Sequence, residues 1–356
     1  MLFEKNPTTE TKEIAQIFNN TVATYKYYWF VSILDIVVKE QRRQLSFWEI
    51  IVGMVVEAWY PIHYFRLSFG LSDSFYKQMI KLQSELNIPI DSKKDFIKSH
   101  ILNNLSNPKI KSILKVFKLN VPYRFLSPWI KYTSDEEVGY YSKSFTNNCL
   151  YAITDETIEI NPKWVLYLNV NYMVLRDFAF WNLNDFVQKR NPNVPNIAYK
   201  LVKPLQRESL IKHRNFWNTF IDINGSMKCI YTGKDLVKKK YDLDHFMPWS
   251  YLPYDLFWNI IPSDHKANLS KSDNLPYLEE YLRPFANMHQ QAIKAIYPKN
   301  PNNKLLEDYL TMYHSVSELA ILSENDFLNV FQKTFSPMVQ IAENMGFRYW
   351  NKPFQV

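Results

Sequence analysis

Apolar residues recur at three- and four-residue steps over the first third of the chain, which is the spacing of helices with one buried face. The pattern runs from Thr9 to about Leu119 and is clearest in Ile14–Phe18, Trp29–Val38 and Phe47–Trp59. The most apolar stretches, residues 27–38 and 47–65, predict buried helices and no membrane span, because neither supplies about 20 uninterrupted apolar residues. The residues that interrupt them are Asp35, Glu49, Glu57 and His63.

The pattern changes twice along the rest of the chain. Residues 149–160 predict a β-hairpin, because two short apolar runs flank Thr154, Asp155 and Glu156. Helical spacing returns afterwards and predicts helices in five ranges: 163–190, 204–222, 277–296, 303–322 and 324–345. A rigid Pro/Asn-rich connection at 188–196 separates the first two.

Residues 223–280 lack helical spacing over most of their length. We expect a strand at 241–246, a long loop at 248–257, a second strand at 259–262, and a helix capped by Asp264 and running to about Asp273. The predicted fold class is therefore α+β, a mostly helical protein with a small embedded α+β domain. We expect three parts: a helical region at 1–222 that contains the hairpin, the α+β domain at 223–280, and a helical segment at 281–356 that packs on the rest.

Composition adds few constraints on function. Hydrophobic residues make up 47% of the 356 positions and only 6 are glycine, which is typical of a globular protein. The formal net charge of +7 permits a polyanionic partner without requiring one. The two cysteines, Cys149 and Cys229, form no disulfide framework or zinc-type spacing, and the N-terminal segment has no apolar signal core. We expect a cytoplasmic protein in a reducing environment.

Residues 241–276 bring together the groups that phosphodiester hydrolysis needs. A neutral histidine can activate water, and a divalent cation on hard oxygen ligands can stabilise the leaving oxygen. Asp244 and Asn268 would supply oxygen ligands, His245 the base, and Asn259 an amide that clamps the loop. Asn268, one turn into the predicted helix, is expected to lean toward Asp244. The simpler alternative is that Asp244 and His245 are a buried, hydrogen-bonded pair.

The order of these residues resembles the HNH nuclease superfamily, the ββα-metal fold. The resemblance rests on Asp244-His245 followed by Phe-Met-Pro-Trp-Ser, on Asn259 within Trp-Asn-Ile-Ile-Pro, and on the segment from Asn268 to Asp273, Asn-Leu-Ser-Lys-Ser-Asp. It is greatest for the branch that includes the HNH domain of RNA-guided CRISPR effector nucleases. Cys229-Ile-Tyr-Thr-Gly resembles the CxxCG knuckle that often opens such domains, but Thr232 replaces the second cysteine.

The resemblance implies a site. His245 would be the general base, Asp244 and Asn268 the ligands of Mg²⁺ with Mn²⁺ as a substitute, and Asn259 would orient the loop that carries the histidine. Lys271 would touch phosphate or brace the helix. No structural zinc is expected, because the knuckle has one cysteine and no later CxxC motif follows.

Other residues in this region have alternative interpretations. His265 could be a third metal ligand, a phosphate contact or a partly exposed helix residue. Lys238, Lys239 and Lys240, together with Lys266, could attract a nucleic-acid backbone, although charge runs are more often solvated turns. Trp249 and Trp258 are expected to pack around the loop.

The expected function is a cytoplasmic, metal-dependent endonuclease that cleaves DNA, with restriction or anti-phage defence as its role. Two alternatives stay open: an HNH nuclease that cleaves RNA, and an inactive nucleic-acid-binding or partner-docking protein. The helical N-terminal region resembles that of a group of bacterial HNH proteins. A homodimer and a regulatory protein partner are both compatible with the sequence. No association with a membrane is expected.

Overall fold

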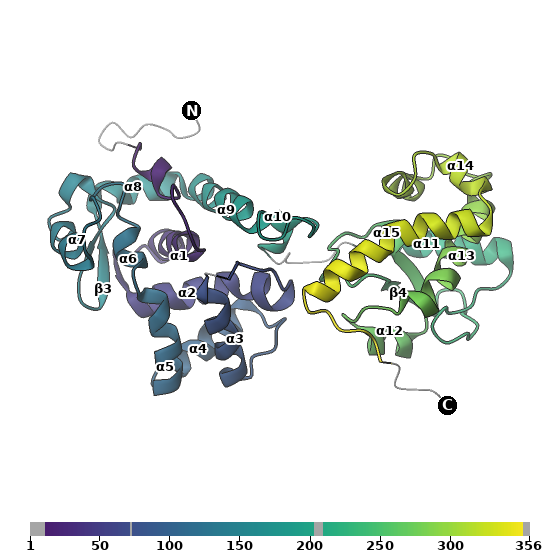
Figure 1. Ribbon diagram of the computed structural model, residues 1–356, viewed down its shortest axis with the longest axis horizontal. Coiled ribbons are helices and arrows are strands. Elements are labelled where there is room, and N and C mark those ends of the chain that lie inside the picture. Colours follow the sequence, from purple (N-terminus) through teal and green to yellow (C-terminus); the bar gives the residue numbers. More distant parts are fainter. Residues whose placement is uncertain (1–10, 72, 203–208, 352–356) are drawn as a thin grey trace. The chain divides into compact units, whose positions relative to one another are not determined.

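The computed structural model describes residues 11–71, 73–202 and 209–351, and its chain divides into two compact units (Figure 1). Unit 1 consists of Met1–Pro192 and Ile197–Lys203, and unit 2 of Asn193–Asn196 and Pro204–Val356. The main division therefore lies near residue 203, whereas the sequence suggested a boundary after 222. The difference arises because helix α11 (Ile211–Asn224) packs on α13 (Leu278–Ile296) of unit 2.

Unit 1 is mainly helical. Its helices are η1 (Ile14–Gln16), α1 (Tyr25–Lys39), α2 (Phe47–Trp59), η2 (Tyr60–Tyr64), α3 (Ser74–Leu86), α4 (Lys94–Asn103), α5 (Pro108–Lys115), η3 (Val116–Lys118), α6 (Val121–Arg124), α7 (Asp135–Ser142), η4 (Thr146–Asn148), α8 (Pro162–Val170), α9 (Tyr172–Gln188) and α10 (Ile197–Lys200). The predicted apolar helices are α1 and α2, which pack against each other. No described helix is long and apolar enough to cross a membrane.

The contact between α1 and α2 depends on a small residue. Ser32 Oγ donates a 2.8 Å hydrogen bond to the Ile50 carbonyl oxygen of the other helix. A Cβ atom added at Gly53 would lie 2.1 Å from Ser32 Oγ, so the two backbones could not approach this closely with any larger residue there. Glycine is unfavourable inside a helix, and here close packing compensates for that cost.

The acids that interrupt the apolar helices form ion pairs inside unit 1. Arg176 of α9 contacts Asp35 at 2.7 Å and Glu57 at 3.1 Å, and Lys94 contacts Glu57 at 2.9 Å. Buried carboxylates are tolerated when they are paired in this way. Glu57 is buried and Asp35 is half-buried, so these ion pairs provide partners for carboxylates that are wholly or partly enclosed.

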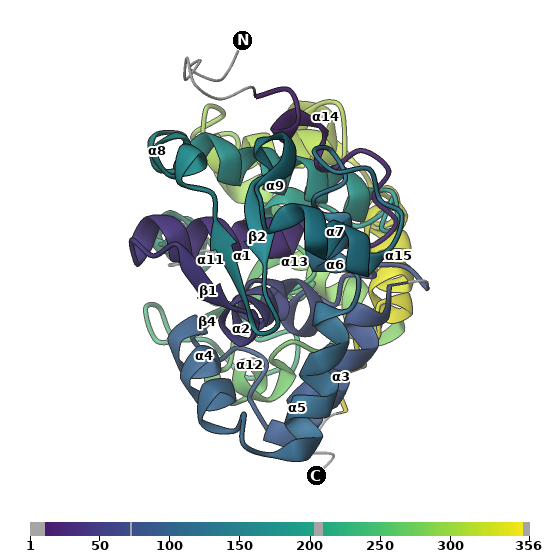
Figure 2. The same ribbon diagram turned by 90° about the vertical axis from the view of Figure 1, so that its left-hand side faces the viewer.

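The predicted hairpin is present as β2 (Tyr151–Ile153) and β3 (Thr157–Ile160), which pair antiparallel. A third strand, β1 (Gln44–Ser46), pairs with β3 and gives the order β1-β3-β2. Figure 2 looks onto the side of unit 1 that carries this sheet. The sequence did not indicate β1, because three residues are too few to show alternation.

Unit 2 surrounds a small hairpin with helices. After α11, its elements are β4 (Asp242–His245), η5 (Phe257–Asn259), β5 (Ile260–Ser263), α12 (His265–Lys271), α13, η6 (Lys304–Thr311), α14 (Val316–Ile321) and α15 (Glu324–Asn344). The single helix predicted at 303–322 is wrong: it is a 3-10 helix followed by α14. The break occurs where Ser315 is extended and its side chain accepts a hydrogen bond from the Glu318 N–H, which caps a new helix.

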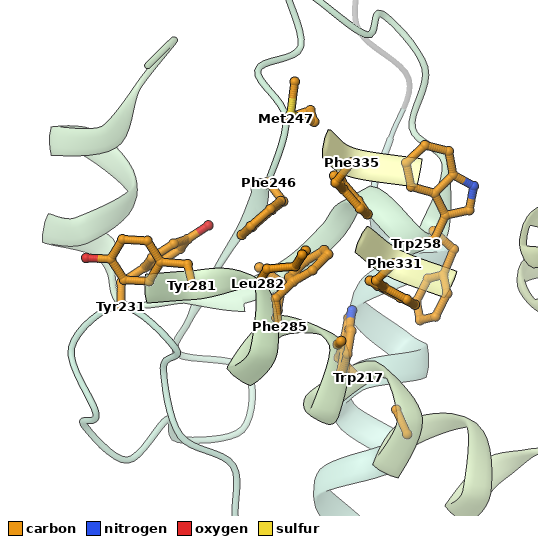
Figure 3. Close-up of a cluster of buried hydrophobic side chains, with 14 of the residues drawn as sticks. Trp217, Tyr231, Phe246, Met247, Trp258, Tyr281, Leu282, Phe285, Phe331 and Phe335 are labelled. Carbon is orange, nitrogen blue, oxygen red and sulfur yellow. The ribbon is translucent and has the colours of Figure 1, made fainter. Parts of the chain in front are cut away.

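The core of unit 2 holds the end of β4 in place. Phe246, the residue after β4, stacks on Phe285 of α13 with ring centroids 4.0 Å apart and packs edge-on against Phe335 of α15 (Figure 3). Phe246 and Met247 are both fully buried. Burying side chains of this size stabilises a fold by about 1.5–3 kcal/mol each. The residues just before Phe246 are therefore attached to a rigid support.

Candidate nuclease site

The predicted strand–loop–strand–helix unit is present in unit 2. β4 pairs antiparallel with β5, with Asp244 opposite Ile261 and His245 opposite Ile260. Asp264 caps α12, because its side chain accepts hydrogen bonds from the backbone N–H groups of Lys266 and Ala267. The hairpin and α12 together form a ββα unit.

The two neighbouring residues Asp244 and His245 have different partners. Asp242 and Asp244 share one face of β4, because side chains two apart in a strand point the same way. Both carboxylates bind residues of α12, which packs on β4. His245 instead binds a residue of the loop between the strands. Alternation along the strand thus gives the acid and the histidine separate supports.

Asp244 is the most enclosed acid of the site, with 4% of its surface exposed. Tyr231 Oη donates to Asp244 Oδ2 at 2.6 Å, and Lys271 Nζ donates to Oδ1 at 3.1 Å. Burial, together with the Asp244 charge, raises the pKa of Tyr231 well above its usual value, so this phenol stays a donor. The Asp244 side chain is therefore held between a phenol and an ammonium group.

Lys271 is a structural residue in this arrangement. Its side chain has no exposed surface, and Nζ also donates to the His245 carbonyl oxygen at 2.7 Å. The expectation that Lys271 binds nucleic acid is wrong, because a fully enclosed ammonium cannot reach a phosphate backbone. Of the two roles that the sequence left open, bracing the helix against β4 is the one observed.

His245 forms a dyad with an acid that the sequence pattern did not indicate. His245 Nε2 lies 2.7 Å from Asp255 Oδ1, and the two side chains are 10% and 14% exposed. Asp255 is the one acidic residue in the loop 248–257. That was the available signal, but a loop pattern does not show which way a side chain points.

The loop that carries Asp255 is itself tied to the surrounding helices. His213 of α11 binds the Asp255 carbonyl oxygen through Nε2 at 2.8 Å, and Asp308 accepts a hydrogen bond from the Phe257 N–H at 2.6 Å. Burial lowers the pKa of His213, which favours the neutral ring and hence an N–H donor to the carbonyl. Elements outside the ββα unit therefore position Asp255.

Asn259 clamps the chain just after His245. Its Oδ1 accepts from the Met247 N–H at 2.8 Å, and its Nδ2 donates to the Met247 carbonyl oxygen at 3.1 Å. Asn259 is completely buried and does not line the pocket beside His245. These contacts fit a role for Asn259 in positioning the start of the loop.

Asn268 binds a different acid from the one expected. Its Nδ2 donates to Asp242 Oδ2 at 3.0 Å, and His265 Nδ1 lies 2.8 Å from the same oxygen. Burial would raise the pKa of Asp242, but the hydrogen bonds from Asn268 and His265 outweigh it and lower that pKa. Asn268 therefore leans over β4 as predicted but bonds two residues before Asp244.

Asp244, His245 and Asn268 nevertheless line one open pocket of about 280 Å³. Its other lining residues are Leu243, Pro248, Trp249, Leu269, Ser272 and Asp273. The pocket gives a substrate access to the three residues that carry the proposed chemistry.

The oxygen atoms available at this pocket are suitable ligands for a hard divalent cation. Asn268 uses its amide N–H for Asp242, so its Oδ1 is left as an acceptor, and each oxygen of Asp244 keeps a lone pair after one hydrogen bond. Magnesium is usually bound by one or two protein oxygen ligands with water and substrate phosphate completing the shell. Within the described residues, no group of three or more His, Cys, Asp or Glu side chains is arranged to hold a metal ion.

The basic residues near the site differ in their availability. Lys238 pairs with Asp222 at 2.5 Å, which ties it to α11. Lys239, Lys240 and Lys266 are exposed, and His265 is also largely exposed while bound to Asp242.

The knuckle before β4 is closed by hydrogen bonds. The Gly233 N–H donates to the Cys229 carbonyl oxygen at 2.8 Å, with Gly233 at φ 70°. The Cys229 N–H donates to the Lys234 carbonyl oxygen at 2.9 Å. Cys229 Sγ accepts from the Asp264 N–H at 3.3 Å, which joins the knuckle to the start of α12. Both cysteines are free and buried.

Comparison with models of protein families gives a match for this region. The model of the HNH endonuclease family matches residues 229–277, which span the knuckle, the hairpin and α12. Comparisons with curated proteins and with solved structures give no match. The relation to the CRISPR effector branch stays a prediction. The family match and the ββα geometry agree, and we conclude that residues 229–277 of this chain are an HNH endonuclease domain.

Proposed function

We propose that this chain is a divalent-metal-dependent endonuclease that hydrolyses phosphodiester bonds in DNA. The observation that carries the proposal is the common pocket of Asp244, His245 and Asn268 inside the HNH domain. A binding protein would not need a histidine, an acid and an amide exposed to one pocket.

His245 would act as the general base through Nδ1. A carboxylate can only accept a hydrogen bond, so Asp255 holds the proton on Nε2 of the neutral ring. Nδ1 then carries the lone pair and can take a proton from water. The imidazolium that results would be stabilised by the Asp255 charge, as in other histidine–carboxylate pairs.

Asp244 and Asn268 would hold the cation, with Mg²⁺ preferred and Mn²⁺ accepted, because both ligands are hard oxygens. The bound cation would supply charge stabilisation at the phosphate and at the departing 3′-oxygen. Lys271 holds the Asp244 carboxylate in place, and Asn259 holds the chain that follows His245. Lys239, Lys240 and Lys266, with His265, would meet the nucleic-acid backbone from their exposed positions.

The test of this proposal is a plasmid-nicking assay in Mg²⁺, Mn²⁺ or EDTA. We expect nicking with either cation and a loss to background in EDTA, restored by excess Mg²⁺. Cleavage that persists in EDTA would contradict the metal role. A structured RNA assayed in parallel separates the alternatives: cleavage of RNA alone would favour the RNA nuclease, and binding without cleavage in every metal would favour the inactive binding protein.

Asp255 provides a sharper test of the base. Replacing it with alanine is expected to lower the cleavage rate at least about 10-fold, but by less than the loss of His245, because the ring remains but lacks the acceptor that holds its Nε2 proton. Asp255→Asn should not restore the rate, because the amide N–H can donate to Nε2 and favour the tautomer that carries its proton on Nδ1. Glu307→Gln, an exposed acid of η6, is the matched control. Equal rates for all three variants would show that Asp255 does not orient His245.

We expect a cytoplasmic protein, because both described cysteines are free and thiols persist in reducing compartments. Restriction or anti-phage defence is the proposed setting. Unit 1 would then control the nuclease, through a protein partner, a second copy of the chain or the shape of the substrate.

A further inference from the structure

Unit 1 contains a pocket of about 730 Å³, which is larger than the pocket of the nuclease site. It is formed by the segment 19–26 at the start of α1, by residues 116–127 around α6, and by Ser74 and Tyr132. Pockets that bind cofactor-sized molecules measure about 300–1,000 Å³. The proposed nuclease chemistry uses none of these residues.

Two cations line this pocket. Lys26 of α1 and Arg124 of α6 both line it, and burial, with a smaller contribution from the Arg124 charge, lowers the pKa of Lys26. Lys26 Nζ has a long 3.4 Å hydrogen bond to the Ile17 carbonyl oxygen, and the Arg124 guanidinium lies 5.4 Å from the centre of the Tyr132 ring. No Asp or Glu is among the described residues that line the pocket. An anion would relieve the repulsion between these two cations.

The nearby acids are already bound. Asp73 accepts hydrogen bonds from the N–H and the hydroxyl of Thr24, and Asp135 accepts one from Tyr132 Oη. Asn20 and Asn120 also line the pocket, with φ values of 58° and 68°. Asparagine adopts positive φ more readily than most residues, and its side chain offers both a hydrogen-bond donor and an acceptor.

The pocket also has an apolar side. Val22 is 73% exposed and Leu119 is 54% exposed, although both are large apolar residues. A ligand with a flat organic group would cover them. A free inorganic ion would not, so the lining fits a molecule that carries both a charged and an apolar part, such as the base and sugar of a nucleotide.

We propose that this pocket binds a small organic phosphate of nucleotide size. Its phosphate would lie between Lys26 and Arg124, because a guanidinium and an ammonium together match phosphate oxygens well. Its planar group would pack over Val22 and Leu119. The proposal concerns unit 1 alone, so it stands whether or not unit 2 cleaves DNA.

The test is isothermal titration calorimetry on the full chain with four probes: 5′-AMP, ATP, adenosine and inorganic phosphate. We expect at least one of the two nucleotides to bind at least 10-fold more tightly than adenosine or phosphate. Arg124→Gln should weaken that binding at least 10-fold, and Lys26→Gln should do the same. Arg124 is exposed, so its variant should fold even if the half-buried Lys26 does not tolerate substitution. Lys143→Gln, an exposed lysine of unit 1 outside the pocket, is the matched control.

Two results would overturn the proposal. One is the failure of both nucleotides to bind the wild-type chain more tightly than adenosine. The other is nucleotide binding that Arg124→Gln leaves unchanged, which would place the ligand elsewhere. Neither result depends on nuclease activity, because the readout is heat of binding.

Discussion

Replacing His245 with alanine is expected to reduce phosphodiester cleavage by about 100- to 10,000-fold, the range over which general acid–base catalysis contributes to enzyme rates. The variant removes the imidazole that, among the described residues, lines the pocket with Asp244 and Asn268. Asp255 cannot replace it as the base, because the Asp255 side chain is only 14% exposed and does not line the pocket. The measurement is the rate of plasmid nicking in Mg²⁺.

His314→Ala is the matched control for this variant. His314 also pairs with an acid of unit 2, Glu318, at 2.8 Å, but it is 68% exposed and does not line the nuclease pocket. It should cleave at the wild-type rate. Both variants should keep the wild-type melting temperature to within a few degrees. Equal nicking by His245→Ala and wild type would mean that the site lies elsewhere.

The second large effect concerns stability. Lys271→Met is expected to cost about 3–5 kcal/mol in the free energy of unfolding of unit 2, the usual cost of breaking a buried ion pair. The substitution roughly keeps the volume of the side chain but leaves the Asp244 carboxylate enclosed without its cation. It also removes the hydrogen bond to the His245 carbonyl oxygen. Calorimetric melting or urea unfolding measures the loss.

A second variant shows whether charge is the cause. Asp244→Asn added to Lys271→Met should recover most of the lost stability, because a neutral amide is much less costly to bury than an unpaired carboxylate. Lys266→Ala, on the exposed side of the same helix, should change stability by no more than about 0.5 kcal/mol. A loss below about 1 kcal/mol for Lys271→Met would contradict the view that the pair is enclosed.

The same pair links folding to the proposed catalysis. Lys271 holds Asp244 through its carboxylate and His245 through its carbonyl oxygen, so one ammonium fixes both residues relative to α12. Asn259 fixes the next turn of chain through Met247. A site supported in this way needs little rearrangement to bind substrate, because the side chains are already oriented.

Much of the nuclease domain follows from the sequence alone. The hairpin, its loop and the Asp264 cap depend on local rules: alternation in strands, and a side-chain acceptor at the start of a helix. The positions of Asp244, His245, Asn259 and Asn268 along these elements follow from the same local rules, together with the order of residues that HNH domains share. These features involve chain segments that are close in sequence.

Only the tertiary structure decided which side chains meet. The Asp255 contact with His245 depends on the path of a ten-residue loop, and that path is set by His213 and Asp308 from distant helices. Lys271 appeared equally able to face solvent or β4, since helix polarity is the same either way. The burial of the ammonium, the partner of Asn268 and the assignment of α11 to unit 2 all arise from packing between segments far apart in the chain, which residue spacing does not encode.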